Sequence, residues 1–170
     1  HQKLPMSYFV VIHGPLGSGK STIAKELAAR LSAERIQIDD VLSEHKLDTH
    51  DDGETGIPAA NFIKALDFVL PDVKQKLDNG QVAIFDGCFY HKEVMDYLPA
   101  NLEYAHYLFT LKAPLEVCIE RDKNRPKPLG EDATKAVYML TSKLDFGEVI
   151  DTVQPLEESV AKILEYLPTK

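Results

Sequence analysis

The sequence predicts an α/β fold in which helices cover both faces of a five-stranded parallel sheet. Short apolar runs alternate with longer segments in which apolar residues recur every three or four positions, a pattern typical of strands connected by helices. The chain has 170 residues, a length that fits one compact domain. A glycine-rich turn follows the first apolar run directly and precedes a helical pattern. Ligands of such sheets bind at the carboxyl ends of the strands, so the segments after each strand are the candidate site.

The first apolar run, Tyr8 to Ile12, leads into a segment that matches the full G-x-x-x-x-G-K-[ST] pattern. Glycines let main-chain amides approach a phosphate closely, and the N-terminus of the following helix adds positive potential. Lys20 is the residue type that neutralises β- and γ-phosphates, and the Ser21 hydroxyl is a ligand type for Mg²⁺. We therefore predict a nucleoside triphosphate site that consists of Gly14, Pro15, Leu16, Gly17, Ser18, Gly19, Lys20, Ser21 and Thr22.

The apolar pattern places the other elements in order along the chain. We expect strands near 35–38, 82–85, 104–111 and 148–152, and helices near 20–32, 59–77, 92–97, 132–144 and 155–167, with a further helix that begins at Pro114. Pro71 should break or kink the helix over 59–77, and Pro99 should end the helix near 92–97. The segment 43–58 is polar and acidic, and it predicts a mobile loop on the substrate side.

Acidic side chains follow two of the predicted strands. Asp39 and Asp40 end the second strand, where a carboxylate would lie near the γ-phosphate and accept or orient the proton of an attacking hydroxyl. We predict Asp39 as this base because it is closest to the strand end; Asp40 as the base, or a capping role for either residue, stays open. Asp86 follows four apolar residues, an arrangement typical of a carboxylate that holds Mg²⁺, although Asp before Gly also occurs in turns.

Two arginines, Arg121 and Arg125, follow the fourth strand and precede a basic loop that contains prolines. Their spacing of four places them on one face of a helix. We predict a lid at about 122–132 in which one arginine grips the nucleotide and the other stabilises charge on the transferring phosphoryl group. A solvated basic helix end is the alternative. Thr152, at the end of the last strand, is predicted to contact the base through its backbone.

Composition limits the partners and the compartment. The net charge of −8 disfavours a long nucleic-acid track and an anionic membrane surface. No run approaches the roughly 18 to 20 apolar residues of a membrane span and no signal peptide is visible, so we predict a cytoplasmic protein. Cys88 and Cys118 lack metal-ligand spacing and are expected to be reduced, buried thiols. Residues 1–5 fit neither signal nor strand, and we interpret them as a non-native remnant before a single domain at 6–170.

With these motifs the chain resembles small P-loop phosphotransferases, the nucleoside- and nucleotide-kinase-like group, over nearly all of its length from Met6. The stretch from Ala113 to Asp122 is similar to the matching segment of adenylylsulfate kinases, and the Asp after the second strand is similar to the base of chloramphenicol phosphotransferases and zeta-toxin-like kinases. The other similar segments are Gly14 to Ser21, Ile38-Asp39-Asp40 and Phe85-Asp86-Gly87. The resemblance implies a P-loop NTPase fold, with three α/β/α layers, a five-stranded parallel sheet and a short lid.

The resemblance also implies ATP and Mg²⁺ as cofactors and transfer of a phosphoryl group to a small acceptor. Carried over by position, Lys20 and Ser21 bind phosphate and Mg²⁺, Asp39 is the base, and Arg121 and Arg125 are the nucleotide and lid arginines. Residues from the strand ends complete the predicted site, with Asp86 as a second metal ligand and Thr152 beside the nucleotide.

We therefore predict an ATP-dependent kinase that moves the γ-phosphate to a hydroxyl of a small molecule, with a nucleoside, a nucleotide or a related metabolite as open candidates. The expected partners are this acceptor and a nucleoside triphosphate, and a homodimer stays open. A GTPase-like switch is one alternative, but the partial guanine motif Ser142-Lys143-Leu144-Asp145 lies in a helical pattern and no D-x-x-G segment follows the third strand. A polynucleotide 5′-hydroxyl kinase is another, and the negative net charge counts against it.

Overall fold

The computed structural model describes residues 7–49 and 56–169. Five parallel strands form one sheet in the order β2-β3-β1-β4-β5. The strands are β1 (Tyr8–His13), β2 (Glu34–Gln37), β3 (Ala83–Gly87), β4 (Ala105–Lys112) and β5 (Glu148–Asp151). The predicted five-stranded parallel sheet is thus confirmed. The interpretation of residues 1–5, and the loop prediction where it concerns residues 50–55, fall outside the described residues.

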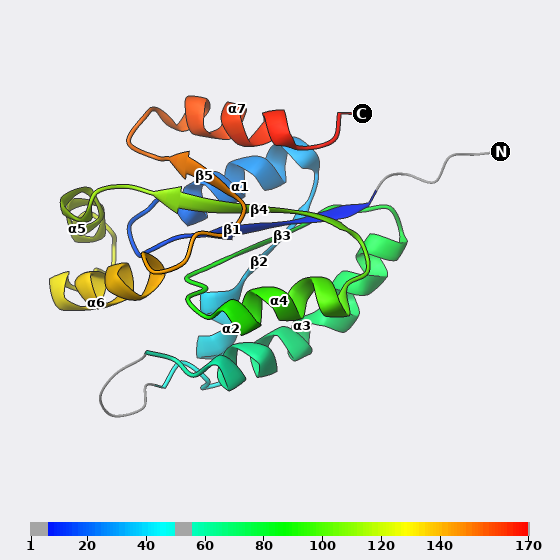
Figure 1. Ribbon diagram of the computed structural model, residues 1–170, viewed down its shortest axis with the longest axis horizontal. Helices are drawn as coiled ribbons and strands as arrows, with labels where there is room; N and C mark the ends of the chain where they lie inside the picture. The colour runs from blue at the N-terminus through cyan, green and yellow to red at the C-terminus, as the bar shows by residue number, and fades with distance from the viewer. Residues whose placement is uncertain (1–6, 50–55, 170) are drawn as a thin grey trace.

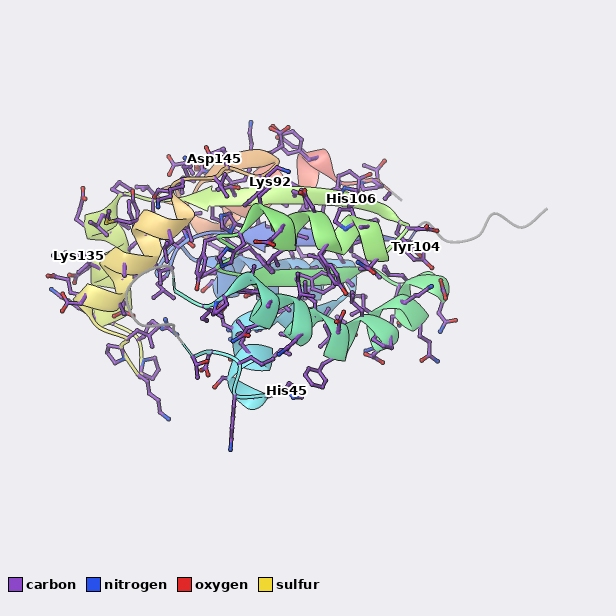
Figure 2. The ribbon with its side chains drawn as sticks, turned by 60° about the horizontal axis from the view of Figure 1, so that its bottom comes forward. His45, Lys92, Tyr104, His106, Lys135 and Asp145 are labelled. Atoms are coloured by element: carbon purple, nitrogen blue, oxygen red, sulfur yellow. The ribbon has the colours of Figure 1, made fainter. Side chains whose placement is uncertain are left out.

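Helices cover both faces of this sheet, as the three-layer prediction requires. α1 and α7 pack on one face, α3 and α4 pack on the other, and α5 and α6 lie together beyond the carboxyl end of β4 (Figure 1). Figure 2 shows Lys135 of α6 at one end of the molecule and Tyr104 and His106, near the start of β4, toward the other. The helices are α1 (Lys20–Leu31), α2 (Ile38–Glu44), α3 (Ala59–Asp78), α4 (Lys92–Asn101), α5 (Leu115–Lys123), α6 (Glu131–Thr141) and α7 (Leu156–Tyr166).

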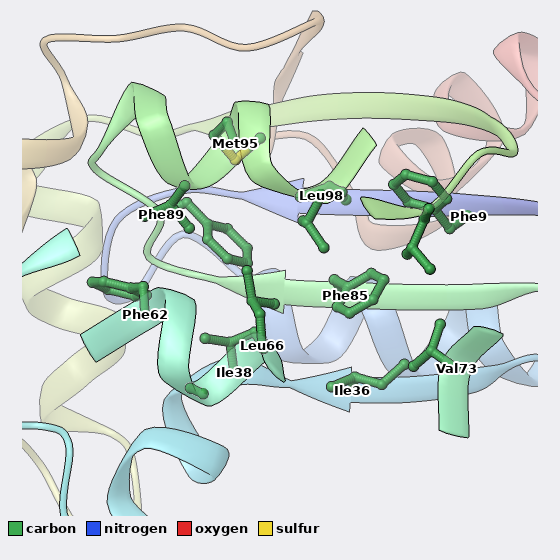
Figure 3. Packing of buried hydrophobic residues seen from close by; sticks show 14 of the residues in the cluster. Phe9, Ile36, Ile38, Phe62, Leu66, Val73, Phe85, Phe89, Met95 and Leu98 are labelled. Carbon is green, nitrogen blue, oxygen red and sulfur yellow. The ribbon is translucent and has the colours of Figure 1, made fainter. Parts of the chain in front are cut away.

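The central strand β1 is buried along its whole length because helices cover both faces of the sheet. Its alternate side chains enter two cores, one shared with α3 and α4 and the other with α1 and α7. In the first core the rings of Phe9 and Phe85 pack edge to face with centroids 6.0 Å apart. Figure 3 shows both rings in one packed layer with Leu98 of α4 and Val73 of α3. Because β1 is buried on both faces and pairs with β3, the carboxyl ends of these two strands are held side by side.

The prediction that Asp39 and Asp40 end a strand is wrong. β2 pairs with β3 only as far as Gln37, opposite Asp86, and α2 begins at the next residue. Both acids therefore lie in the first turn of a helix, where the helix dipole favours negative charge. Neither is the cap, because Gln37 holds that position. Since α2 begins where the strand stops, the two carboxylates still lie at the carboxyl edge of the sheet.

Two prolines lie inside continuous helices, so the predicted break at Pro71 and the predicted helix end at Pro99 are wrong. α3 runs unbroken through Pro71, and α4 runs through Pro99 to Asn101. Residues before and after Pro71 are buried in the same core, so packing outweighs the local cost of the proline. α3 has 20 residues. Neither it nor any other helix in the described part of the chain is long and apolar enough to cross a membrane.

The segment that partly matches a guanine motif lies in a loop and not in a helix. α6 ends at Thr141, so Ser142 to Asp145 connect α6 to β5. Asp145 pairs with Lys112 Nζ at 2.9 Å, which ties this loop to the end of β4. The segment precedes a strand, whereas a base-binding motif in this fold would follow one.

Candidate active site

The turn between β1 and α1 forms a cradle of main-chain groups. Gly17 and Gly19 have φ values of +75° and +94°, a region that side chains rarely adopt. A Cβ atom on Gly17 would overlap the carbonyl oxygen of Cys118 on α5, and one on Gly14 would lie 2.7 Å from Ser18 Oγ. Ser18 Oγ is buried and has no hydrogen-bond partner. The cradle is therefore closely packed against α5, and it leaves a buried hydroxyl free for an anion.

Lys20 lies at the start of α1 with its side chain folded back over the turn. Its Nζ donates a hydrogen bond to the Pro15 carbonyl oxygen at 2.9 Å, and the side chain is buried. Burial lowers the pKa of Lys20, but Cys88, Asp39 and Asp86 oppose this effect, and the pKa lies above its ordinary value. The ammonium group therefore stays charged at neutral pH, as a phosphate-binding lysine must.

Cys88, directly after β3, lies beside both Lys20 and Asp39. Burial raises the pKa of the Cys88 thiol to about 12, with smaller effects from the neighbouring Lys20 and Asp39. Cys88 and Cys118 are both free and buried, as their spacing predicts. At neutral pH Cys88 is thus an uncharged thiol that neighbours both Lys20 and the candidate base Asp39.

Arg35 of β2 pairs with Asp86 of β3 behind the lysine. Arg35 Nε donates to Asp86 Oδ2 at 2.7 Å, and the side chains are 17% and 1% exposed. Burial raises the pKa of Asp86, opposed by Arg35 and by Lys20. Arg35 Nη2 is buried and has no hydrogen-bond partner. The predicted metal carboxylate therefore already has a cation on one of its two oxygens.

Arg121 of α5 connects two loops at the carboxyl edge of the sheet. Its Nη1 donates to the Gly17 carbonyl oxygen at 3.2 Å and to Thr152 Oγ1 at 3.1 Å, and its Nη2 donates to the Thr152 carbonyl oxygen at 2.6 Å. The guanidinium group thus joins the cradle to the turn after β5. Arg125 does not share a helix face with it, because α5 ends at Lys123 and Arg125 belongs to the following loop.

One cleft connects the cradle with the ends of β2 and β5. Its volume is about 730 Å³, within the usual range for small-ligand sites. Asp39 and Asp40 follow β2 and Thr152 follows β5, and these two strands lie at opposite edges of the sheet. The lining residues are Leu16, Gly17, Gly19, Lys20, Ser21, Thr22, Ile23, Lys25, Arg35, Gln37, Asp39, Asp40, Arg121, Arg125, Leu129, Thr152, Gln154, Leu156 and Ser159.

Residues 10–139 match the family model AAA_18, which is described as an AAA domain. The chain belongs to this family.

It is similar to a shikimate kinase from Actinobacillus succinogenes, with 30% identity over 165 residues that cover 91% of this chain and 89% of the relative. A solved sugar kinase from Janibacter matches with a TM-score of 0.75 at 23% identity and covers 95% of this chain and 94% of its own. A gluconokinase from Sinorhizobium meliloti matches with a TM-score of 0.63 at 17% identity over 96% and 92% of the two chains. The protein is a small P-loop kinase.

The kinase cleft brings together most of the predicted site residues. All four predicted catalytic residues line it, namely Lys20, Asp39, Arg121 and Arg125, as do the metal candidate Ser21 and the nucleotide candidates Leu16, Gly17, Gly19, Thr22 and Thr152. Gly14, Pro15 and Ser18 lie in the cradle but are not among the lining residues, and Asp86 lies behind Arg35.

Arg35 and Gln37 of β2 line the kinase cleft but escape sequence reasoning. Arg35 and Gln37 alternate with Ile36 along β2, so they point away from the core that Ile36 enters. The alternation of polar and apolar residues along β2 could have predicted that Arg35 and Gln37 face the site. The backbone of Gln154, after β5, is a sequence-based candidate for contact with the base, and this residue lines the cleft.

Proposed function

We propose that this kinase transfers the γ-phosphate of ATP to a hydroxyl group of a small molecule, with Asp39 as the base. The observation that carries the proposal is that Asp39 lines the same cleft as Lys20 and Ser21. A carboxylate at one end of a phosphate cradle can accept or orient the hydroxyl proton while the cradle holds the donor. Lys20 and Arg125 would stabilise the negative charge that spreads over the transferring group.

The cradle fits a triphosphate, and neighbouring residues fit Mg²⁺. The buried, unpartnered Ser18 hydroxyl and the charged Lys20 are suitable partners for phosphate oxygens. Ser21 lines the cleft, and Asp86 keeps one carboxylate oxygen that Arg35 does not contact. Magnesium is commonly held by one or two protein oxygens together with phosphates and waters, so Ser21 would ligate the ion and Asp86 would hold it directly or through a water. When bound, Mg²⁺ would neutralise charge between the β- and γ-phosphates.

Gln154 favours adenine over guanine as the base. Its Nε2 donates to the Asp151 carbonyl oxygen at 2.9 Å through one of its two N–H groups, and Oε1 keeps its capacity to accept a hydrogen bond. Gln154 lies at the end of the cleft opposite Asp39, together with the apolar side chains of Leu129 and Leu156. An oxygen acceptor there suits the 6-amino group of adenine and repels the 6-oxygen of guanine.

We propose an uncharged or positively charged hydroxyl compound as the acceptor. Shikimate and gluconate, the acceptors in the names of two similar proteins, carry a carboxylate. Arginine is the residue type that best recognises a carboxylate, and no arginine occurs between residues 36 and 120 of this sequence. Arg35 lines the cleft, but its charge is matched by Asp86. Asp39 and Asp40 instead give the acceptor end negative charge.

The test is an ADP-release screen with ATP and Mg²⁺ against nucleosides, neutral sugars, aminoglycosides and hydroxy acids, followed by mass spectrometry for the added phosphate. We expect a neutral or cationic compound to stimulate ADP release and to gain one phosphate. Stimulation by hydroxy acids alone would contradict the proposed acceptor charge. If GTP supported transfer and ATP did not, the proposed donor would be wrong.

A further inference from the structure

The buried carboxylate of Asp122 holds the loop that follows α5. Its side chain is 2% exposed. Oδ1 accepts a hydrogen bond from the Leu129 N–H at 3.1 Å, and Oδ2 accepts one from the Gly130 N–H at 2.9 Å. The Asp122 carbonyl oxygen also accepts from the Arg125 N–H at 3.1 Å. One residue therefore fastens the loop near its beginning and at its end.

This loop brings two side chains to the nucleotide cleft. Arg125 and Leu129 both line it, although Arg125 is 47% exposed and Leu129 is also largely exposed. Arg125 Nη1 lies 3.7 Å from Asp122 Oδ1, a distance longer than a hydrogen bond. Exposed side chains on a loop keep a defined position only if the backbone beneath them is fixed. The hydrogen bonds to Asp122 supply that fixation.

The same carboxylate sets where α6 begins. Gly130 is the N-cap residue of α6, and its N–H is bound by Asp122 while its carbonyl oxygen accepts from Thr134 Oγ1 at 2.8 Å. Near the other end of α6, Leu140 approaches Gly56 so closely that a Cβ atom on Gly56 would lie 3.0 Å from Leu140 Cδ1. A shift of α6 would therefore reach Gly56, near the end of the acidic segment 43–58.

We infer that Asp122 is a positioning residue for phosphoryl transfer, which acts by holding Arg125 and Leu129 at the cleft. Arg121, the preceding residue, contacts the cradle and the turn after β5. Two adjacent residues of α5 thus have separate roles: Arg121 joins the cradle to the turn after β5, and Asp122 holds the loop that follows α5. The inference rests on the proposed function, in which Arg125 stabilises negative charge on the transferring phosphoryl group. It assigns a function to a side chain that touches neither reactant.

The decisive variant is Asp122→Asn, with Glu120→Gln as the matched control. Asparagine keeps the shape of the side chain, but it replaces one acceptor oxygen by an N–H donor that faces a backbone N–H. Glu120→Gln is the same acid-to-amide change at an exposed position of α5. With the acceptor found by ADP release, we expect Asp122→Asn to lower the rate of phosphate transfer about tenfold or more, and Glu120→Gln to leave that rate unchanged. Circular dichroism verifies that both variants are folded.

A double-mutant cycle with Arg125→Ala separates positioning from general destabilisation. If Asp122 acts through Arg125, Asp122→Asn should lower the rate of phosphate transfer little further once Arg125 is gone, so the two losses will not add. An equal loss with and without Arg125 would overturn the inference.

Hydrogen exchange on the wild-type protein gives a test that does not depend on catalysis or on the stability of a variant. In the wild type the Leu129 and Gly130 amides should exchange slowly. In Asp122→Asn the same two amides should exchange at least about tenfold faster. Rapid exchange of both amides in the wild type would contradict the inference even if the enzyme binds ATP. Protected amides in a protein that does not bind ATP would instead count against the proposed function.

Discussion

Arg35 Nε and Asp86 Oδ2 are 2.7 Å apart, on neighbouring strands β2 and β3. The Asp86 side chain is almost completely buried, and Lys20 is the other cation that offsets its charge. The acid that would assist Mg²⁺ therefore lies in a preformed ion pair at the back of the cleft. Removing one member of a buried ion pair leaves the other charge uncompensated.

Arg35→Met should therefore destabilise the protein by about 3 kcal/mol, because it leaves the Asp86 carboxylate buried without its main cation. The double variant Arg35→Met with Asp86→Asn should recover part of that loss, since no buried charge then remains. Urea unfolding at pH 7 measures both values. Equal losses in the single and double variants would show that the ion pair does not determine stability at this position.

Arg35 also shows how far sequence reasoning reaches in this chain. The cradle is a local motif between a buried strand and a helix, so it and the sheet around β1 are predicted well. Arg35 and Asp86 are 51 positions apart, and their contact depends on β2 lying beside β3. Asp122 is missed for a different reason, because its partners are backbone N–H groups of Leu129 and Gly130 that no residue pattern marks.

The error at Asp39 has a physical cause as well. A strand and the first turn of a helix can share an apolar residue, and Ile38 is buried in either state. Only the end of pairing with β3 at Gln37 decides that α2 has begun. The position of the carboxylate at the sheet edge was predictable, but its secondary structure was not.

Gly17→Ala should lower stability and weaken nucleotide binding. Its φ of +75° is unfavourable for alanine, and the new methyl group would overlap the Cys118 carbonyl oxygen. Gly80→Ala is the control for backbone strain, because Gly80 has a similar φ of +83° and follows α3 without lining the cleft. We expect Gly17→Ala to cost about 1 to 3 kcal/mol more than Gly80→Ala in urea unfolding. Similar losses in the two variants would mean that backbone strain alone accounts for the glycine.

His13 should make the stability depend on pH. Burial lowers the pKa of His13 to about 4, whereas the unfolded chain takes up the proton near pH 6.5. The unfolded state therefore binds more protons between these values. Stability should fall by up to about 3 kcal/mol as the pH drops from about 6.5 to about 4. His13→Phe, whose ring would pack against Phe146, should flatten this part of the profile. An unchanged slope in that variant would assign the pH dependence to other groups.

Gln154→Ala should reduce discrimination between ATP and GTP. Loss of one hydrogen bond to the 6-amino group predicts a decrease of about tenfold in the preference for ATP. Inosine triphosphate, which has an oxygen in place of the amino group, should bind the wild type as poorly as GTP does. Competition binding with the three nucleotides measures this. A wild-type enzyme that binds all three equally would remove Gln154 from base recognition.

The central claim is that Asp39 acts on the acceptor while the cradle holds the donor, and Asp39→Asn tests it against Asp40→Asn. With the acceptor found by ADP release, the rate of phosphate transfer should fall about 100- to 10,000-fold in Asp39→Asn. The dissociation constant for ATP with Mg²⁺ should stay within about twofold of the wild-type value, because the cradle is intact. Asp40→Asn should retain transfer. Normal transfer by Asp39→Asn, with or without loss in Asp40→Asn, would contradict the account.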